Sequence, residues 1–180
     1  MNSINQNQEE ENTKNLSGSG AVEKVRELAN INKTCFFSTH SQSAPSQGTR
    51  PMTVQEVDEA GDLWFLISND SLTYQDIKAD SQVKLYFQGS AHSDFLYIEG
   101  IASTSRDTDK IEKYWSPIIK NWFTEGKDDP RITVVKVHAT HGYYWDNKNG
   151  NAVAAIKMAA GAVLGKTLDD SIEGTIDFNN

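Results

Sequence analysis

The chain is poor in cysteine and has no long apolar run. Its single cysteine, Cys35, excludes an intrachain disulfide and any metal site built from several cysteines. Cys35 lies in an apolar run, so we interpret it as a small buried hydrophobic residue. The most apolar late segment, residues 152–164, is too short to span a bilayer, and residues 1–11 lack the apolar block of a signal peptide. We therefore expect a cytoplasmic protein without membrane contact.

Positive charge is also scarce. The sequence has 17 Lys and Arg residues against 25 Asp and Glu residues, which gives a net charge of −8. Non-specific nucleic-acid binding needs a basic face that displaces counterions, so we expect no nucleic-acid partner. The negative net charge does not exclude a small anionic ligand, because a local cluster of positive side chains can bind an anion in a protein that is negative overall. The length of 180 residues suits one domain with a full core.

Common catalytic and metal-binding motifs are absent. There is no P-loop and no Gly-x-Ser-x-Gly elbow, and the segment Gly18-Ser19-Gly20 reads as a flexible linker, since Glu23 stands where a dinucleotide loop needs its third glycine. His138 and His141 have an odd separation, which places them on opposite faces of a strand unless a bulge intervenes. We therefore expect no metal site, and no acid or base receives a catalytic role.

Composition divides the chain into four parts. Residues 1–19 are rich in Asn, Gln, Glu and Ser, which predicts a disordered N-terminal arm. Residues 20–150 carry the periodic patterns of a folded domain. Residues 151–166 are predicted to form a C-terminal helix, and residues 167–180 a loose acidic tail.

Within residues 20–150 most patterns are of the β type. Apolar residues in 21–31 have helical spacing, and short helices are expected at 71–79 and 107–115. About six strands are expected between turns, at residues 33–40, 49–57, 63–68, 82–88, 95–105 and 132–145. Many strands with few, short helices predict a mainly β fold with flanking helices, an antiparallel barrel rather than a parallel α/β sheet.

Two sequence elements together describe a phosphate cradle. Arg50 precedes Pro51, which has no backbone N–H to donate to a neighbouring strand and therefore suits the edge of a sheet. An arginine at such an edge can bind a phosphate through two N–H groups of its guanidinium. Residues 70–73 follow a strand and open a helix, so backbone N–H groups and the hydroxyls of Ser71 and Thr73 can face an anion. The alternatives are a surface salt bridge for Arg50 and plain helix capping for Ser71.

The aromatic segment 114–130 ends in a charged Gly/Asp/Pro turn. Its Trp115 and Trp122, with Trp64 and Trp145, could line a ligand pocket. In a small barrel, however, large rings more often form core or dimer contacts, and we favour packing for Trp115 and Trp122. Trp145 follows the last long strand and could approach a ligand.

These residues, in this order and spacing, resemble a known family. The chain is similar over about residues 20–150 to the general stress proteins related to pyridoxamine 5'-phosphate oxidase, which are FMN-binding split barrels. The matching motifs are Arg50-Pro51-Met52, Gly61-Asp62-Leu63-Trp64-Phe65, Ser71, Gly100, Trp115-Ser116-Pro117, Trp122-Phe123, Gly126-Lys127-Asp128-Asp129-Pro130 and Tyr144-Trp145-Asp146.

The resemblance implies a split barrel that forms a homodimer, with two FMN sites at the subunit interface and the phosphate near Arg50 and the Ser71 turn. The flavin ring would take contacts from both chains. The cofactor-binding residues implied are Arg50, Pro51, Met52, Ser68, Ser71, Thr73 and Trp145.

The chain departs from the family pattern at two positions. Members usually have a lysine where this chain has Thr73, and commonly a threonine where it has Ile67. Loss of a charge-assisted hydrogen bond costs about 1.5–3 kcal/mol, so FMN affinity is expected to be roughly 10- to 100-fold lower. Lys78 lies on a later helical turn.

Three functional interpretations stay open. The first is a flavin-dependent oxidoreductase of unknown substrate, in which FMN supplies the redox chemistry. The second is a non-catalytic dimer that binds or sequesters FMN or another planar phosphorylated ligand. The third is a split barrel whose cofactor site is degenerate, or a related use of the fold such as haem binding.

Overall fold

The computed structural model describes residues 12–40, 48–91, 93–164 and 170–178. Nine strands in these ranges form one sheet, in the order β1-β9-β8-β7-β6-β2-β3, with β5 paired to β8 and β4 to β5. The strands are β1 (Leu16–Ser17), β2 (Thr34–Thr39), β3 (Thr49–Thr53), β4 (Glu56–Val57), β5 (Leu63–Ser68), β6 (Gln82–Gln88), β7 (Phe95–Ser105), β8 (Ile132–Asn147) and β9 (Ser171–Asp177). The helices are α1 (Gly18–Ile31), α2 (Leu72–Ala79), α3 (Thr108–Tyr114), η3 (Ile119–Asn121), η4 (Gly126–Asp128) and α4 (Asn151–Leu164).

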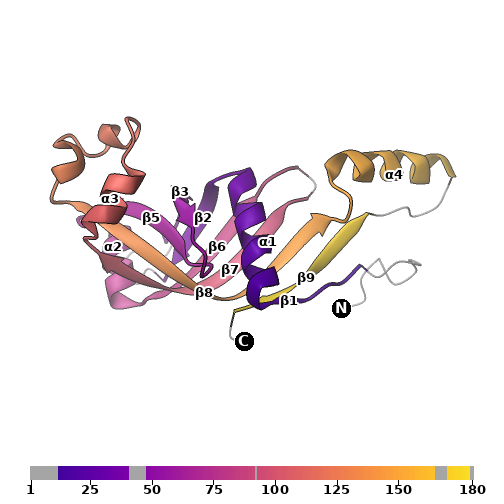
Figure 1. Cartoon of the computed structure of the whole chain (residues 1–180), viewed down its shortest axis with the longest axis horizontal. Helices are drawn as coiled ribbons and strands as arrows, with labels where there is room; N and C mark the ends of the chain where they lie inside the picture. The colour runs from indigo at the N-terminus through magenta and orange to yellow at the C-terminus, as the bar shows by residue number, and fades with distance from the viewer. Residues whose placement is uncertain (1–11, 41–47, 92, 165–169, 179–180) are drawn as a thin grey trace.

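The long strand β8 joins a barrel to an extension. One edge of β8 pairs with β7 along almost its whole length. The other edge pairs first with β5 and, nearer its end, with β9. The first half of β8 therefore belongs to the barrel, whereas the second half runs with β9 and β1 toward α4 at the far end of the molecule (Figure 1). The predicted mainly β fold with flanking helices is confirmed, but the number of strands is larger than six.

A β-bulge lies where the barrel gives way to the extension. The register shifts between Glu99 and Gly100, so that Thr140 is an extra residue in β8. A Cβ at Gly100 would lie 2.6 Å from the backbone oxygen of His138, which explains the glycine there. The bulge also pairs His138 with Ile101 and His141 with Glu99, two positions on one face. A bulge was the stated exception to the expectation of opposite faces, and because it is present the two histidines lie on one face.

The core fills the barrel between the sheet and α1. Strand β6 alternates strictly between buried and exposed side chains, as its sequence pattern predicts. Helix α1 contributes Ala21, Val25, Leu28 and Ala29, which are at most 1% exposed. Cys35 is also buried there, and desolvation raises the pKa of its thiol to about 12, which confirms its interpretation as a hydrophobic residue.

A smaller apolar cluster attaches the aromatic segment to the barrel. Ile111 and Phe123 pack with Ile132 and Val134 of β8, and the half-buried Trp115 joins them. Trp122 behaves differently, because its side chain is 65% exposed. Trp115 therefore packs within this chain as predicted, whereas Trp122 does not belong to the core of this chain, and its contact with a dimer partner stays a prediction.

Both chain ends contain regular structure that the sequence did not predict. Residues 12–19, assigned to a disordered arm, include β1, which pairs in parallel with β9, and the start of α1 at Gly18. Residues 170–178, assigned to a loose tail, include β9, whose Ile176 is 1% exposed. These two segments are ordered by their pairing with each other and with β8, which local composition does not reveal. Residues 1–11, 165–169 and 179–180 lie outside the described ranges.

Two further findings concern the described residues only. No helix in these ranges is long and apolar enough to cross a membrane. No group of three or more His, Cys, Asp or Glu side chains there could hold a metal ion.

Glu56 links the barrel to α3. Its carboxylate accepts hydrogen bonds from Lys113 at 2.8 Å, from Lys110 at 3.2 Å and from the hydroxyl of Tyr114. The hydrogen bond from Lys113, followed by that from Tyr114, lowers the pKa of Glu56 to about 2. A carboxylate with a lowered pKa stabilises the fold above its unfolded pKa and loses that effect as the pH falls through its folded pKa.

We predict that Glu56→Gln lowers the free energy of unfolding by about 1–3 kcal/mol at neutral pH, because charge-assisted hydrogen bonds are lost. The difference from wild type should shrink as the pH falls from about 4.5 toward about 2. Urea unfolding at several pH values measures it. Glu112→Gln removes only an exposed pair with Lys127 and should cost less than about 1 kcal/mol. A pH-independent loss for Glu56→Gln would contradict this account.

Candidate functional site

A pocket of about 760 Å³ lies where the barrel is not closed. One side is edge strand β3, which pairs with β2 and with no other strand in the described ranges. The opposite side is the end of β5 and the turn into α2, and the segment 116–123 covers the space between them. The pocket therefore depends on two strand edges that do not pair.

Six of the seven cofactor-binding residues implied by the resemblance line this pocket. They come from β3 and from the turn between β5 and α2, which are distant in sequence. The six are Arg50, Pro51, Met52, Ser68, Ser71 and Thr73. The prediction that Arg50 and Pro51 occupy an edge strand is confirmed.

Arg50 is oriented by groups behind it rather than by a surface carboxylate. Its Nη1 donates to the hydroxyl of Thr73, and its Nη2 lies 3.4 Å from Oδ2 of Asp76. Asp76 is only 5% exposed and also accepts a 2.7 Å hydrogen bond from Oγ1 of Thr39. A buried carboxylate of this kind fixes the direction of the guanidinium at the pocket wall.

The first turn of α2 presents free donors. The hydroxyl of Ser71 caps the helix, since it accepts from the backbone N–H of Tyr74 at 3.2 Å, and it donates to the carbonyl of Ser68 at 2.6 Å. The hydroxyl of Ser71 therefore caps the helix, which was the alternative to phosphate binding for this side chain. In contrast, the backbone N–H groups of Leu72 and Thr73 have no acceptor among the described residues. Thr73 is 3% exposed, so an anion in the pocket would satisfy a buried donor.

The two departures from the family pattern have clear structural positions. The Oγ1 atom of Thr73 accepts from Arg50, which leaves the hydroxyl proton of Thr73 available to a ligand. Ile67 is 8% exposed and adds apolar surface to the pocket. Lys78 is exposed on α2 and does not line the pocket, so it is not placed to replace a lysine at position 73.

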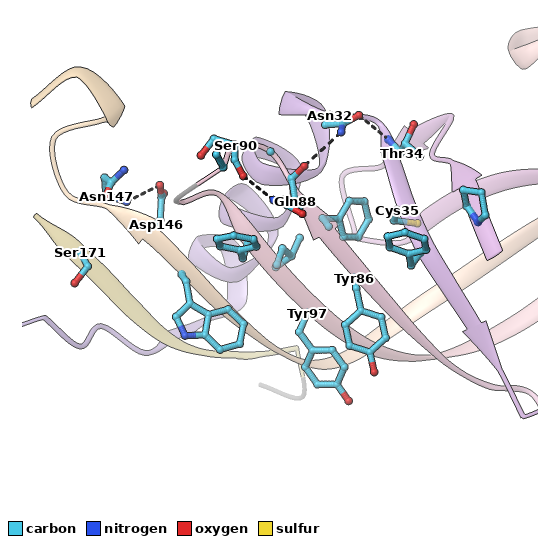
Figure 2. A pocket seen from close by; sticks show the side chains of 18 residues that line it. Asn32, Thr34, Cys35, Tyr86, Gln88, Ser90, Tyr97, Asp146, Asn147 and Ser171 are labelled. Carbon is cyan, nitrogen blue, oxygen red and sulfur yellow. Dashed lines mark hydrogen bonds between the residues drawn. The ribbon is translucent and has the colours of Figure 1, made fainter. Parts of the chain in front are cut away.

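Trp145 lies in a different groove on the outer face of the sheet. This second groove measures about 1250 Å³ and includes Tyr86 and Tyr97, which project from neighbouring strands (Figure 2). Trp145 is 44% exposed, and its ring lies 4.6 Å from that of Tyr143. A single chain thus does not bring Trp145 to the other six residues. The two grooves nevertheless share Thr34 and Pro51.

Sequence reasoning did not select three groups of the pocket. Trp122 and Ile118, which are 65% and 67% exposed, form an apolar wall. Arg131 supplies a second cation at the start of β8. The pairing of Ser68 with Ile132 brings Arg131 next to the turn before α2, a contact that only the register of β5 and β8 reveals.

The fold and this pocket define a split β-barrel protein with a pocket at its open seam. Residues 20–169 match the family described as "Pyridoxamine 5'-phosphate oxidase like". The chain belongs to this family, which confirms the resemblance found in its sequence.

Known proteins agree with this assignment. The chain is 25% identical to Protein bli-3 of Neurospora crassa over 156 residues. The aligned region covers 80% of this chain and 75% of that protein. A general stress protein 26 from Jannaschia sp. CCS1 has the same fold, with a TM-score of 0.70, 18% identity, and coverage of 87% of this chain and 95% of that one. The general stress FMN/FAD binding protein of Xanthomonas citri gives a TM-score of 0.57 at 24% identity, and the match covers 68% of this chain and 84% of that one.

We predict that Arg50→Ala weakens the binding of FMN, the cofactor that the resemblance implies, about 10- to 100-fold, because it removes the charge-assisted contact expected with the phosphate. Lys78→Ala, on the same helix as Thr73 but outside the pocket, should leave the affinity within about twofold. Flavin-fluorescence titration measures both. Equal effects of the two variants would place the phosphate elsewhere. Thermal unfolding of Arg50→Ala is needed in parallel, since the buried Asp76 loses its cationic partner and keeps only the hydrogen bond from Thr39, and Arg50→Lys should retain part of the affinity.

Proposed function

We propose that the protein binds FMN in the pocket between β3 and β5. The observation that carries this proposal is that Arg50 and Thr73 line one pocket at the first turn of α2, where the N–H groups of Leu72 and Thr73 have no acceptor among the described residues. Together with the hydroxyl of Thr73, these groups suit a phosphate. The apolar wall of Ile118 and Trp122 suits a planar ring.

The size of the pocket and the comparisons support the same ligand. A volume of about 760 Å³ is in the range typical of sites for cofactors and drug-sized ligands. The relative from Xanthomonas citri is described as binding FMN or FAD. We choose FMN because the pocket residues offer one compact set of anion donors.

We further propose that the protein is a flavin-dependent oxidoreductase of unknown substrate. FMN, when bound, supplies hydride or electron transfer. The residues of this chain bind the phosphate, orient the ring and limit the access of water.

A second candidate function is non-catalytic flavin binding. The titratable side chains that line the pocket are Arg50, Asp70 and Arg131 only. No His, Cys, Lys, Glu or Tyr among the described residues lines it. This observation favours a protein that carries or sequesters flavin if no turnover is measured.

The outer face of the sheet supports a homodimer. Pro51, Phe36, Tyr86, Tyr97 and Tyr143 are directly paired from strand to strand, so they share one face and form a continuous row, the aromatic row. Phe36 is 59% exposed and Tyr86 44% exposed, and Figure 2 shows Tyr86 and Tyr97 projecting side by side. Exposed Phe, Tyr and Trp are typical of protein interfaces.

A second copy of the chain is the occupant that we propose for this face. The aromatic row begins at Pro51, which also lines the flavin pocket, so an interface on this face would adjoin the pocket. Trp145 lies on the same surface, beside Tyr143. In a dimer, Trp145, the one implied cofactor-binding residue outside the pocket, would therefore belong to the interface.

We predict that the purified protein is yellow, or that it quenches the fluorescence of added FMN with one FMN per chain at micromolar affinity. A visible spectrum and a titration measure this. A colourless protein that does not quench FMN at high concentration would refute the proposed ligand. Oxidation of NADH or NADPH with an electron acceptor then separates the two functions, because an oxidoreductase cycles its flavin and a carrier does not.

We predict that Phe36→Glu converts a dimer into a monomer, because a charge within the aromatic row must be desolvated on association. Sedimentation equilibrium of both proteins measures the mass. Phe36→Tyr, which keeps an exposed aromatic ring, is the matched control and should remain dimeric. A monomeric wild type, or a dimer that survives Phe36→Glu, would show that this face is not the interface.

A further inference from the structure

Arg131 is supported from behind by a buried carboxylate. Its Nε and Nη2 donate to the two oxygens of Asp129, at 3.1 and 2.8 Å. The side chain of Asp129 is fully buried, and the hydrogen bonds from Arg131 lower the pKa of its carboxyl to about 2. The turn that carries Asp129 is itself fixed, since Arg106 donates to the carbonyls of Asp128 and Asp129. The guanidinium of Arg131 is therefore oriented before any ligand arrives.

The third nitrogen of this guanidinium is free. Nη1 of Arg131 makes no hydrogen bond to any described residue, and its nearest charged neighbour is Oδ2 of Asp70 at 4.0 Å. The side chain of Arg131 is 40% exposed and lines the flavin pocket.

Backbone contacts place this nitrogen beside the phosphate cradle. The N–H of Asn69 donates to the carbonyl of Arg131 at 2.9 Å, and Ser68 pairs with the next residue of β8, Ile132. Arg131 therefore adjoins the turn from Ser68 to Ser71 that opens α2. Arg50 contacts the same helix through Thr73 and Asp76. The two arginines thus flank the first turn of α2, whose N–H groups at Leu72 and Thr73 lack acceptors.

We propose that Arg131 is a second phosphate-binding residue of the pocket, and that its Nη1 binds the ligand's phosphate from the exposed side while Arg50 binds it from the interior. This inference rests on the proposed function. Asp70 is the group that competes for Nη1 when no anion is present. It is 64% exposed, so its carboxylate can turn toward solvent when a phosphate binds, with loss of the 2.5 Å hydrogen bond that it accepts from Ser68.

The test compares two flavins that differ only in the phosphate. Wild type, Arg131→Gln and Asp70→Asn are titrated with FMN and with riboflavin. Arg131→Gln should weaken FMN about 10-fold and leave riboflavin within about twofold, because only the phosphate contact is lost. Asp70→Asn should tighten FMN binding, because it removes the competing carboxylate, and should not change riboflavin binding.

The outcomes separate this inference from the proposed function. A wild type that binds neither flavin refutes the proposed function and this inference with it. A wild type that binds FMN, with Arg131→Gln binding it equally well or losing FMN and riboflavin to the same extent, overturns the role of Arg131 alone.

Folding is controlled separately, because Arg131→Gln leaves the buried Asp129 with fewer partners. Arg131→Lys keeps the charge and should retain part of the preference for FMN over riboflavin. Asp70→Asn changes an exposed side chain, and its thermal unfolding should match wild type. If Asp70→Asn is folded and binds FMN no more tightly than wild type does, Nη1 of Arg131 does not contact the phosphate.

Discussion

The site exists because β3 and the last residues of β5 do not pair with each other, although β5 pairs with β4 at its start and with β8 along its length. Closure of the sheet at this seam would place backbone hydrogen bonds where the pocket lies. Pro51 in the middle of β3 has no N–H to donate, which weakens that edge as a template for another strand. The segment 116–123 covers the seam instead, and it is attached from outside by Phe123 in the smaller apolar cluster. An open seam with a packed cover is thus the constraint on which the cradle depends.

Buried carboxylates lie behind both arginines of the pocket, in a chain whose net charge is −8. Asp76 is 5% exposed behind Arg50, and Asp129 is fully buried behind Arg131. Each carboxylate offsets part of the positive charge that faces the pocket. In the proposed site, recognition of a phosphate would depend on the direction of donors, namely two guanidinium groups, the hydroxyl of Thr73 and the N–H groups of Leu72 and Thr73, more than on net positive potential.

Local patterns were enough for most elements of the fold. The strict alternation in β6 and the helical spacing of α1 predicted both elements, because burial of one face determines each pattern. The segments whose structure was not predicted correctly depend on partners that are distant in sequence. The two residues of β1 form a strand only by pairing with β9, and His138 and His141 share a face only because of the bulge at Gly100.

The residues of the candidate site likewise divide into those that the sequence predicted and those that depend on distant strand pairing. The resemblance selected six residues that one pocket brings together, starting from Arg50 and Ser71. Arg131 was missed because its place beside Ser68 follows from the register of β5 and β8. Trp145 was assigned to the flavin site, but in one chain it lies on the outer face of the sheet. Since Pro51 and Thr34 belong to both grooves, a second chain on that face would also bound the pocket. A ligand that contacts both chains must stabilise their association by as much as association raises its affinity, so dimer and cofactor site would be thermodynamically linked.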